Sequence, residues 1–180
     1  MPVHIGVIRA VNVGGHGGLG MDDLRATVAS LGFTDVRTYL ATGNVLFRSA
    51  GRAPPSLERA LEVATRDRTG IATDFIVRTS AEWDAARAAN PFPDAARDDP
   101  AHLTVIFLKG PPARGAEGAL RAAIRGREQI RVVGTQAYAV YPDGIGRSKL
   151  TLPVIERHLG FRGTARNWST VSRLAALASG

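Results

Sequence analysis

The stretch Val36-Arg37-Thr38-Tyr39-Leu40-Ala41-Thr42-Gly43-Asn44-Val45-Leu46-Phe47 decides the fold that we expect for this chain. Its two ends have the composition of short strands, and Thr42-Gly43-Asn44 between them is typical of a tight hairpin. On both sides of the hairpin, apolar residues recur three and four positions apart, which indicates one helix before it and another after it. The hairpin is therefore expected to join two helices, as in a β-α-β-β-α-β order.

The same order of elements is expected in both halves of the 180-residue chain. In the first half, the strands and helices are predicted at residues 3–13, 22–31, 36–40, 45–47, 56–69 and 75–77. In the second half, they are predicted at residues 103–108, 113–125, 130–133, 138–141, 153–159 and 162–165, before a closing helix from residue 168. This order predicts an α+β fold (an α/β sandwich) of two ferredoxin-like units with antiparallel sheets plus a C-terminal helix. The expected boundaries are 1–79 for the first unit, 80–100 for a helical connector and 101–180 for the second unit.

The expected strand at residues 103–108 is apolar on both faces, whereas a strand with one face in water alternates. The face of the sheet that lacks helices must therefore be covered, either by the other half of the chain or by a second subunit. A homo-oligomer is accordingly one of two arrangements that the sequence leaves open.

The composition is that of a globular protein, with 44% apolar and 22% charged residues. No apolar run approaches the roughly 20 residues of a membrane span, and the first residues lack the pattern of a signal peptide. We therefore expect a cytoplasmic protein without membrane contact. The chain contains no cysteine, which excludes disulfides, thiolate zinc sites and cysteine nucleophiles.

The formal net charge of +7 is concentrated in the second half. Residues 1–100 carry 11 basic and 12 acidic side chains, whereas residues 101–180 carry 12 and 4. Such a surface attracts nucleic acid, nucleotides or other acidic partners. Arginine-favouring codon usage is the competing explanation, because only two of the 23 basic residues are lysines.

Four short polar segments at the ends of expected strands carry the candidate ligand-binding residues. In the predicted topology the first strand pairs with the third, which places the end of the first strand beside the hairpin. In the second half, the ends of the third and fourth strands reach one edge in the same way. The two expected clusters are Arg9, Asn12, Gly14, Gly15, Thr42, Gly43 and Asn44, and Arg147, Ser148, Lys149, Arg166 and Asn167.

The polar segments belong to a series of strings that follow one another along nearly the whole chain. Among them are Ile8-Arg9-Ala10-Val11-Asn12-Val13-Gly14-Gly15, Leu31-Gly32-Phe33, Gly43-Asn44-Val45, Asn90-Pro91-Phe92-Pro93, Gly146-Arg147-Ser148-Lys149-Leu150 and Thr164-Ala165-Arg166-Asn167-Trp168. This series resembles a bacterial family catalogued as domain of unknown function 1697. The resemblance implies a ferredoxin-like α/β fold in two parts and no established activity. The family's lysines after the double glycine are missing here, where glycines and His16 follow instead.

The candidate residues also have structural explanations. Asn167 is suited to capping the final helix, and Asn12 and Asn44 are as suited to holding the loop and the hairpin as to touching a ligand. The string Gly144-Ile145-Gly146-Arg147-Ser148-Lys149 indicates either an anion site or a turn with a basic face, since it lacks P-loop spacing. Gly15-x-Gly17-x-x-Gly20 matches a dinucleotide fingerprint, but the strand after the next helix enters a hairpin, which argues against a Rossmann unit.

Two functions follow from these patterns. The first is a non-catalytic module that binds a phosphate-bearing or other anionic ligand, a nucleotide or nucleic acid, through the basic loops of the second half. The alternative is an enzyme that acts on a small anionic metabolite in the cleft between the two halves, although no acid-base group is evident. We expect no cofactor, and no metal because the four histidines lack metal-ligand spacing.

Overall fold

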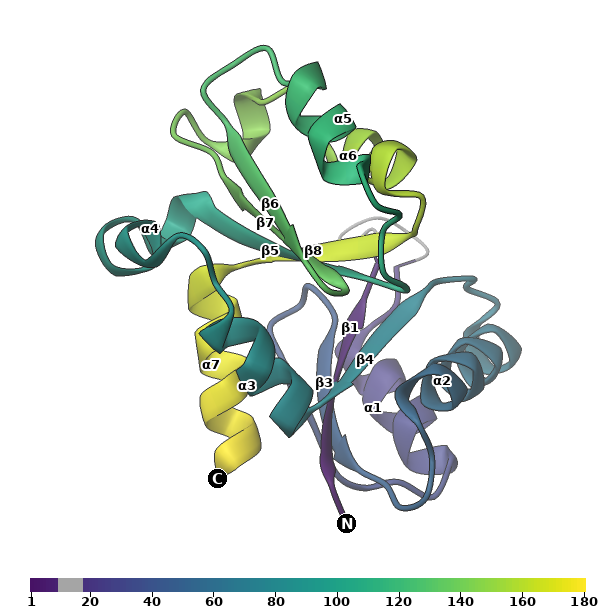
Figure 1. Ribbon diagram of the computed structural model, residues 1–180. Coiled ribbons are helices and arrows are strands. Elements are labelled where there is room, and N and C mark those ends of the chain that lie inside the picture. The colour runs from purple at the N-terminus through teal and green to yellow at the C-terminus, as the bar shows by residue number, and fades with distance from the viewer. Residues whose placement is uncertain (10–17) are drawn as a thin grey trace. The chain divides into compact units, whose positions relative to one another are not determined.

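A computed structural model describes residues 1–9 and 18–180 of the chain (Figure 1). The candidate residues Asn12, Gly14 and Gly15 lie outside the described residues, as does the end of the first expected strand. The chain forms two compact units, Met1–Asp84 with Leu174–Gly180, and Ala85–Arg173. The boundaries at 1–79, 80–100 and 101–180 stay a prediction.

The first unit has the expected order of elements. These are β1 (Val3–Ile8), α1 (Met21–Ser30), β2 (Thr34–Tyr39), β3 (Asn44–Arg48), α2 (Pro54–Thr69) and β4 (Phe75–Thr79). The strands form one antiparallel sheet in the order β2-β3-β1-β4, with β1 paired to both β3 and β4. Helices α1 and α2 lie on one face of this sheet (Figure 1), where they build the core of the unit.

The second unit repeats this order after two short helices. Its elements are α3 (Ser80–Ala88), α4 (Pro93–Asp98), a 3-10 turn η1 (Pro100–His102), β5 (Leu103–Leu108), α5 (Ala116–Ala123), β6 (Gln129–Val133), β7 (Gln136–Val140), a 3-10 turn η2 (Ile145–Arg147), α6 (Leu152–Leu159), β8 (Gly163–Asn167) and α7 (Trp168–Ser179). The boundaries of the two units fall inside α3 and α7. The sheet is again antiparallel, in the order β6-β7-β5-β8.

The predicted α+β fold with antiparallel sheets is therefore confirmed, and the assignment of two ferredoxin-like units stays a prediction. The described residues form seven α-helices and two four-stranded antiparallel sheets, which is an α+β fold. In both sheets the first strand of the unit lies between the third and the fourth, as the β-α-β-β-α-β order requires. The described helices include none that is both long enough and apolar enough to cross a membrane.

Both faces of β5 are buried, as its apolar sequence predicts. All six of its residues are buried. Ile106 and Leu108 belong to the core under α5 and α6, so Val105 and Phe107 point to the opposite face. Tyr138, opposite Val105 in the β5–β7 pairing, shares that second face, and its hydroxyl donates to the carbonyl oxygen of Ala86 in α3. This hydrogen bond ties the second face to α3, and a homo-oligomer stays an untested expectation.

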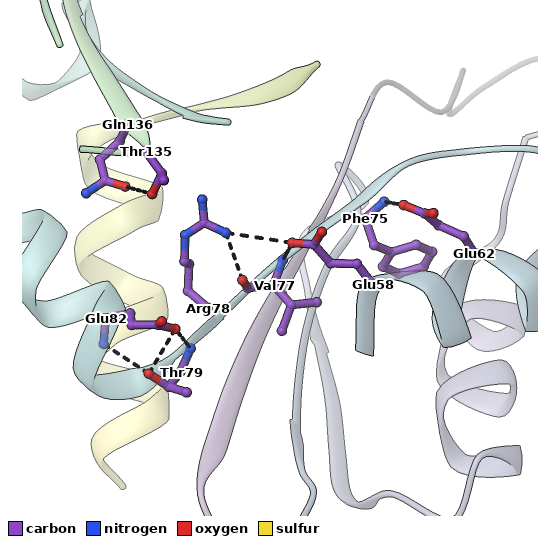
Figure 2. Close-up of polar contacts among 9 residues, drawn as sticks. All are labelled: Glu58, Glu62, Phe75, Val77, Arg78, Thr79, Glu82, Thr135 and Gln136. Atoms are coloured by element: carbon purple, nitrogen blue, oxygen red, sulfur yellow. Dashed lines mark hydrogen bonds and ion pairs between the residues drawn. The ribbon is translucent and has the colours of Figure 1, made fainter. Parts of the chain in front are cut away.

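Two glutamates of α2 complete the hydrogen bonding of β4 at the edge of the first sheet. Glu58 Oε1 accepts a hydrogen bond of 2.9 Å from the amide of Val77, and Glu62 Oε1 accepts one of 3.0 Å from the amide of Phe75 (Figure 2). The two glutamates are four residues apart in the helix and the two amides two residues apart in the strand. These separations match, because four helical residues rise about 6 Å and two strand residues about 6.6 Å. The carboxylates therefore act where a further strand would otherwise pair.

Arg78 makes the Glu58 carboxylate part of a buried ion pair. Its Nη1 lies 3.7 Å from Glu58 Oε1 and donates to the carbonyl oxygen of Val77 over 2.9 Å (Figure 2). The two side chains are only 12% and 9% exposed. Burial lowers the pKa of Arg78, and the charge of Glu58 opposes that shift.

We predict that Glu58→Ala lowers the free energy of unfolding by about 2–4 kcal/mol, because it removes the acceptor of a buried amide and the counter-charge of Arg78. Denaturant unfolding measures this change. Asp67→Ala, on an exposed part of the same helix, is the control and should have little effect. Equal losses in the two variants would contradict the edge role of Glu58.

His4 is a second buried polar residue, in the core of the first unit. It is 1% exposed, and its ring stacks on Phe47 with ring centroids 5.4 Å apart. No described residue is a hydrogen-bond partner of its Nδ1 atom. Burial lowers the pKa of His4 below its ordinary value of 6.5, although the carbonyl of Pro2 and the charge of Glu82 act in the opposite direction.

The lowered pKa predicts that the protein loses stability as the pH falls below about 6.5, since the unfolded chain then binds a proton that folded His4 does not. His4→Phe should keep the ring stack and flatten this part of the pH profile. Denaturant unfolding of both proteins between pH 7 and pH 5 measures the difference. Parallel profiles would show that His4 does not titrate on unfolding.

A candidate anion-binding pocket

The described members of the first expected cluster meet at one end of the first sheet. The amide of Ile8, the last residue of β1, donates to the carbonyl oxygen of Gly43 in the hairpin over 2.9 Å. Arg9 follows, and its own amide donates to Asp74 O over 2.9 Å. The topology thus places Arg9 between the β2–β3 hairpin and the start of β4.

Within the hairpin itself, the polar residues hold the turn together. Asn44 is fully buried, and its Nδ2 donates to Tyr39 O at 2.7 Å and to Thr42 Oγ1 at 3.0 Å. Gly43 has a φ of +85°, and a Cβ at this position would lie 3.1 Å from the Cβ of Ile8. Of the two roles open to Asn44, these contacts favour the structural one. The described residues of this cluster leave the ligand-binding assignment a prediction.

The second expected cluster divides between two faces of the second sheet. Val140 at the end of β7 pairs with Leu103, and Asn167 at the end of β8 pairs with Thr104, so both strands end at the same edge. However, Ala165 packs in the core under α5 and α6. Its neighbour Arg166 therefore points to the opposite face, because side chains alternate along a strand.

Arg166 and Asn167 make hydrogen bonds that give both side chains a structural role. Arg166 is 8% exposed, and its Nη1 donates to Thr164 Oγ1 and to Ala165 O, both at 2.8 Å. Burial lowers the pKa of Arg166 to about 10. Asn167 Oδ1 accepts a hydrogen bond of 2.9 Å from the amide of Thr170, so this side chain caps α7.

Arg147, Ser148 and Lys149 instead line a pocket of about 330 Å³ in the second unit. Its other wall is the connection from α5 to β6, which contributes Arg125 and Glu128. The register explains this proximity: Gln129 at the start of β6 pairs with Val140 at the end of β7. The residues before β6 therefore lie beside those after β7. The apolar part of the lining includes Ile124, Leu150 and Val154.

Arg125, Arg147 and Lys149 supply the positive charge of the pocket. All three are exposed. None of them makes a hydrogen bond or ion pair with another residue in the part of the chain that the structure describes. Arg125 was not among the residues singled out from the sequence, although the register of the β6–β7 hairpin could have indicated it.

The two carboxylates of the pocket have different partners. Asp143 is exposed and forms an ion pair with Arg127, whose Nε donates to Asp143 Oδ2 over 3.2 Å. The hydrogen bond from Arg127 lowers the pKa of Asp143. Glu128 is half-buried, and its Oε1 accepts a hydrogen bond of 2.6 Å from Ser148 Oγ, which in turn accepts one of 3.0 Å from the amide of Leu150.

These hydrogen bonds hold the pocket's two loops together. Ser148 links the loop after β7 to the α5–β6 connection through Glu128. The hydroxyl of Tyr141 donates to Leu150 O over 2.9 Å, which closes the loop after β7 at its base. Residues 1–9 and 18–180 hold no group of three histidine, cysteine, aspartate or glutamate side chains arranged to bind a metal ion.

The fold places this chain in the class of α+β proteins with two four-stranded antiparallel sheets. The chain belongs to the family described as protein of unknown function (DUF1697), whose model matches residues 1–138. This confirms the family resemblance of the sequence. The match includes Arg125 and Glu128 and ends before Arg147.

A solved structure supports the fold over the full length. The chain is similar to a conserved bacterial protein from Streptococcus pneumoniae, with a TM-score of 0.79 and 18% sequence identity. The similarity covers 100% of this chain and 99% of that one. At this identity the likeness shows the fold alone. No curated protein matches the chain.

We predict that Asn167→Ala lowers the free energy of unfolding by about 1 kcal/mol, as expected for the loss of an N-cap. Asn167→Ser should retain most of the stability, because a hydroxyl oxygen can also accept from the amide of Thr170. Denaturant unfolding distinguishes the two variants. If the alanine and serine variants are equally stable, the cap contributes nothing.

Proposed function

We propose that the protein is a non-catalytic module that binds a small phosphate-bearing or other anionic ligand in the pocket of the second unit. The observation that carries this proposal is the gathering of Arg125, Arg147 and Lys149 around one pocket, where none of the three forms a hydrogen bond or ion pair with another described residue. Neighbouring cations repel one another, and a bound anion would replace this repulsion with attraction. Guanidinium and ammonium groups are also the side chains best suited to phosphate oxygens.

The acidic residues of the pocket leave it with an excess of positive charge. Asp143 forms its ion pair with Arg127, which lies outside the lining, and Arg147 adds a longer-range attraction to the same carboxylate. Glu128 is the remaining carboxylate, so cations exceed the available anionic groups. The excess of basic residues in the second half of the sequence extends this attraction beyond the pocket.

The size and the apolar lining favour a small molecule over a nucleic-acid strand. Ligand pockets commonly measure about 300–1,000 Å³, and this one measures about 330 Å³. Ile124, Leu150 and Val154 give it an apolar surface as well as charges. A ligand with one anionic group and a compact body of carbon atoms fits such a lining.

The proposal predicts that pyrophosphate binds the protein at low salt and that Arg147→Ala and Lys149→Ala each weaken binding by roughly five-fold or more. Isothermal titration calorimetry measures both. Arg114→Ala is the matched control, because Arg114 is exposed, lies outside the pocket and has no described partner. No heat with the wild-type protein, or equal losses in all three variants, would refute the pocket as an anion site.

A duplex DNA probe separates the two kinds of anionic ligand. Binding by a nucleic-acid surface weakens with salt on a log-log slope of about −0.9 for each neutralised phosphate. We expect the duplex to bind no more tightly than pyrophosphate at equal salt. A duplex that binds much more tightly, with a steep slope that Arg114→Ala also reduces, would indicate a nucleic-acid surface instead of a small-molecule pocket.

A further inference from the structure

Glu128 is a carboxylate in a pocket whose other free charges are positive. A phosphate that enters beside Arg125, Arg147 and Lys149 meets the repulsion of this carboxylate. Glu128 Oε1 accepts a hydrogen bond of 2.6 Å from Ser148 Oγ. No residue in the described parts of the chain donates a hydrogen bond to Glu128 Oε2. The hydrogen bond from Ser148 gives Glu128 Oε1 a structural role, but a ligand that carried only a phosphate would be repelled by the charge at Oε2.

Gly126 shows that the fold makes room for the carboxylate. A Cβ at residue 126 would lie 2.3 Å from Glu128 Oε2 and 3.0 Å from its Cδ. The backbone of Gly126 is not left-handed, so its conformation does not require glycine. A side chain at residue 126 would therefore displace the Glu128 carboxylate from its present position in the wall of the pocket.

We propose that Glu128 accepts a hydrogen bond from a hydroxyl group of the ligand, so that the pocket selects a phosphorylated sugar, either free or as part of a nucleotide. The inference rests on the proposed anion-binding function and names its ligand class. An ionised carboxylate is an acceptor only, and it pairs with a donor. An ammonium donor would be repelled by the three cations, whereas a neutral hydroxyl is not. A sugar phosphate carries both the anion and several neutral hydroxyls on one compact carbon framework.

The test compares ribose 5-phosphate with ethyl phosphate, which has no hydroxyl beyond the phosphate. The wild-type protein should prefer ribose 5-phosphate, and Glu128→Gln should reduce this preference by roughly ten-fold, since hydrogen bonds to charged groups are the stronger ones. The ratio of the two dissociation constants is the decisive quantity. The repulsion between Glu128 and the phosphate is common to both ligands and cancels in this ratio.

Two glycine variants test the geometry independently. Gly126→Ala should displace the carboxylate and reduce the preference in the same direction as Glu128→Gln. Gly146→Ala is the matched control in the opposite loop, because a Cβ there meets no atom within 4 Å and the backbone is not left-handed. It should leave the preference unchanged. Circular dichroism and unfolding curves confirm that each variant is folded before titration.

A preference that Glu128→Gln and Gly126→Ala both reduce supports the inference. If wild type binds both ligands without preference, or Glu128→Gln leaves the preference intact, the inference is overturned and the anion pocket stands. If phosphoethanolamine binds as tightly as ribose 5-phosphate, Glu128 does not distinguish a hydroxyl from an ammonium group, and the inference is overturned. If neither phosphate binds wild type, the proposed function itself fails.

Discussion

Hydrogen bonds from the amides of edge strands to the carboxylates of helices hold helix to sheet in each unit, and in the second unit one of them supports the pocket. In the second unit, Glu117 of α5 accepts a hydrogen bond of 2.8 Å from the amide of Val132 in β6. Glu58 and Glu62 of α2 act in the same way on β4. An edge strand exposes amides that have no strand to pair with, and each of these carboxylates supplies a charged acceptor. The bond from Val132 also ties α5 to β6 and so restrains both ends of the connection that carries Arg125 and Glu128.

The second wall of the pocket is fixed by different contacts. The register of β6 against β7 brings the residues before β6 next to those after β7. The Ser148–Glu128 hydrogen bond then joins the two loops. Arg147 and Lys149 thus belong to a loop that is restrained by the hydrogen bonds of Tyr141 and Ser148. Exposed cations on a restrained loop lose less conformational freedom on binding a ligand, which favours recognition of a small anion.

Much of the fold could be predicted from the sequence because two kinds of signal agreed. The Thr42-Gly43-Asn44 turn and the helical spacing on both sides of it allowed one order of elements, and the unbroken apolar run of β5 correctly indicated burial on both faces. The residues of the site were harder to predict than the fold, because the face on which a strand residue lies depends on the register of the strand. Arg166 was grouped with Lys149 because both follow strands that end at one edge, yet its side chain points away from α5 and α6. Arg125 and Glu128 were not identified, because a connection between a helix and a strand shows no motif until the pairing of β6 with β7 is known.

If the loops after α5 and after β7 form one ligand site, a ligand must perturb both of them. Amide chemical-shift mapping by ¹⁵N NMR, with ribose 5-phosphate added to the full chain, examines both loops in one titration. We expect saturable shifts at residues 124–128 and 143–150 together, with a single dissociation constant. Shifts confined to one of the two loops, or scattered over exposed arginines elsewhere, would contradict it.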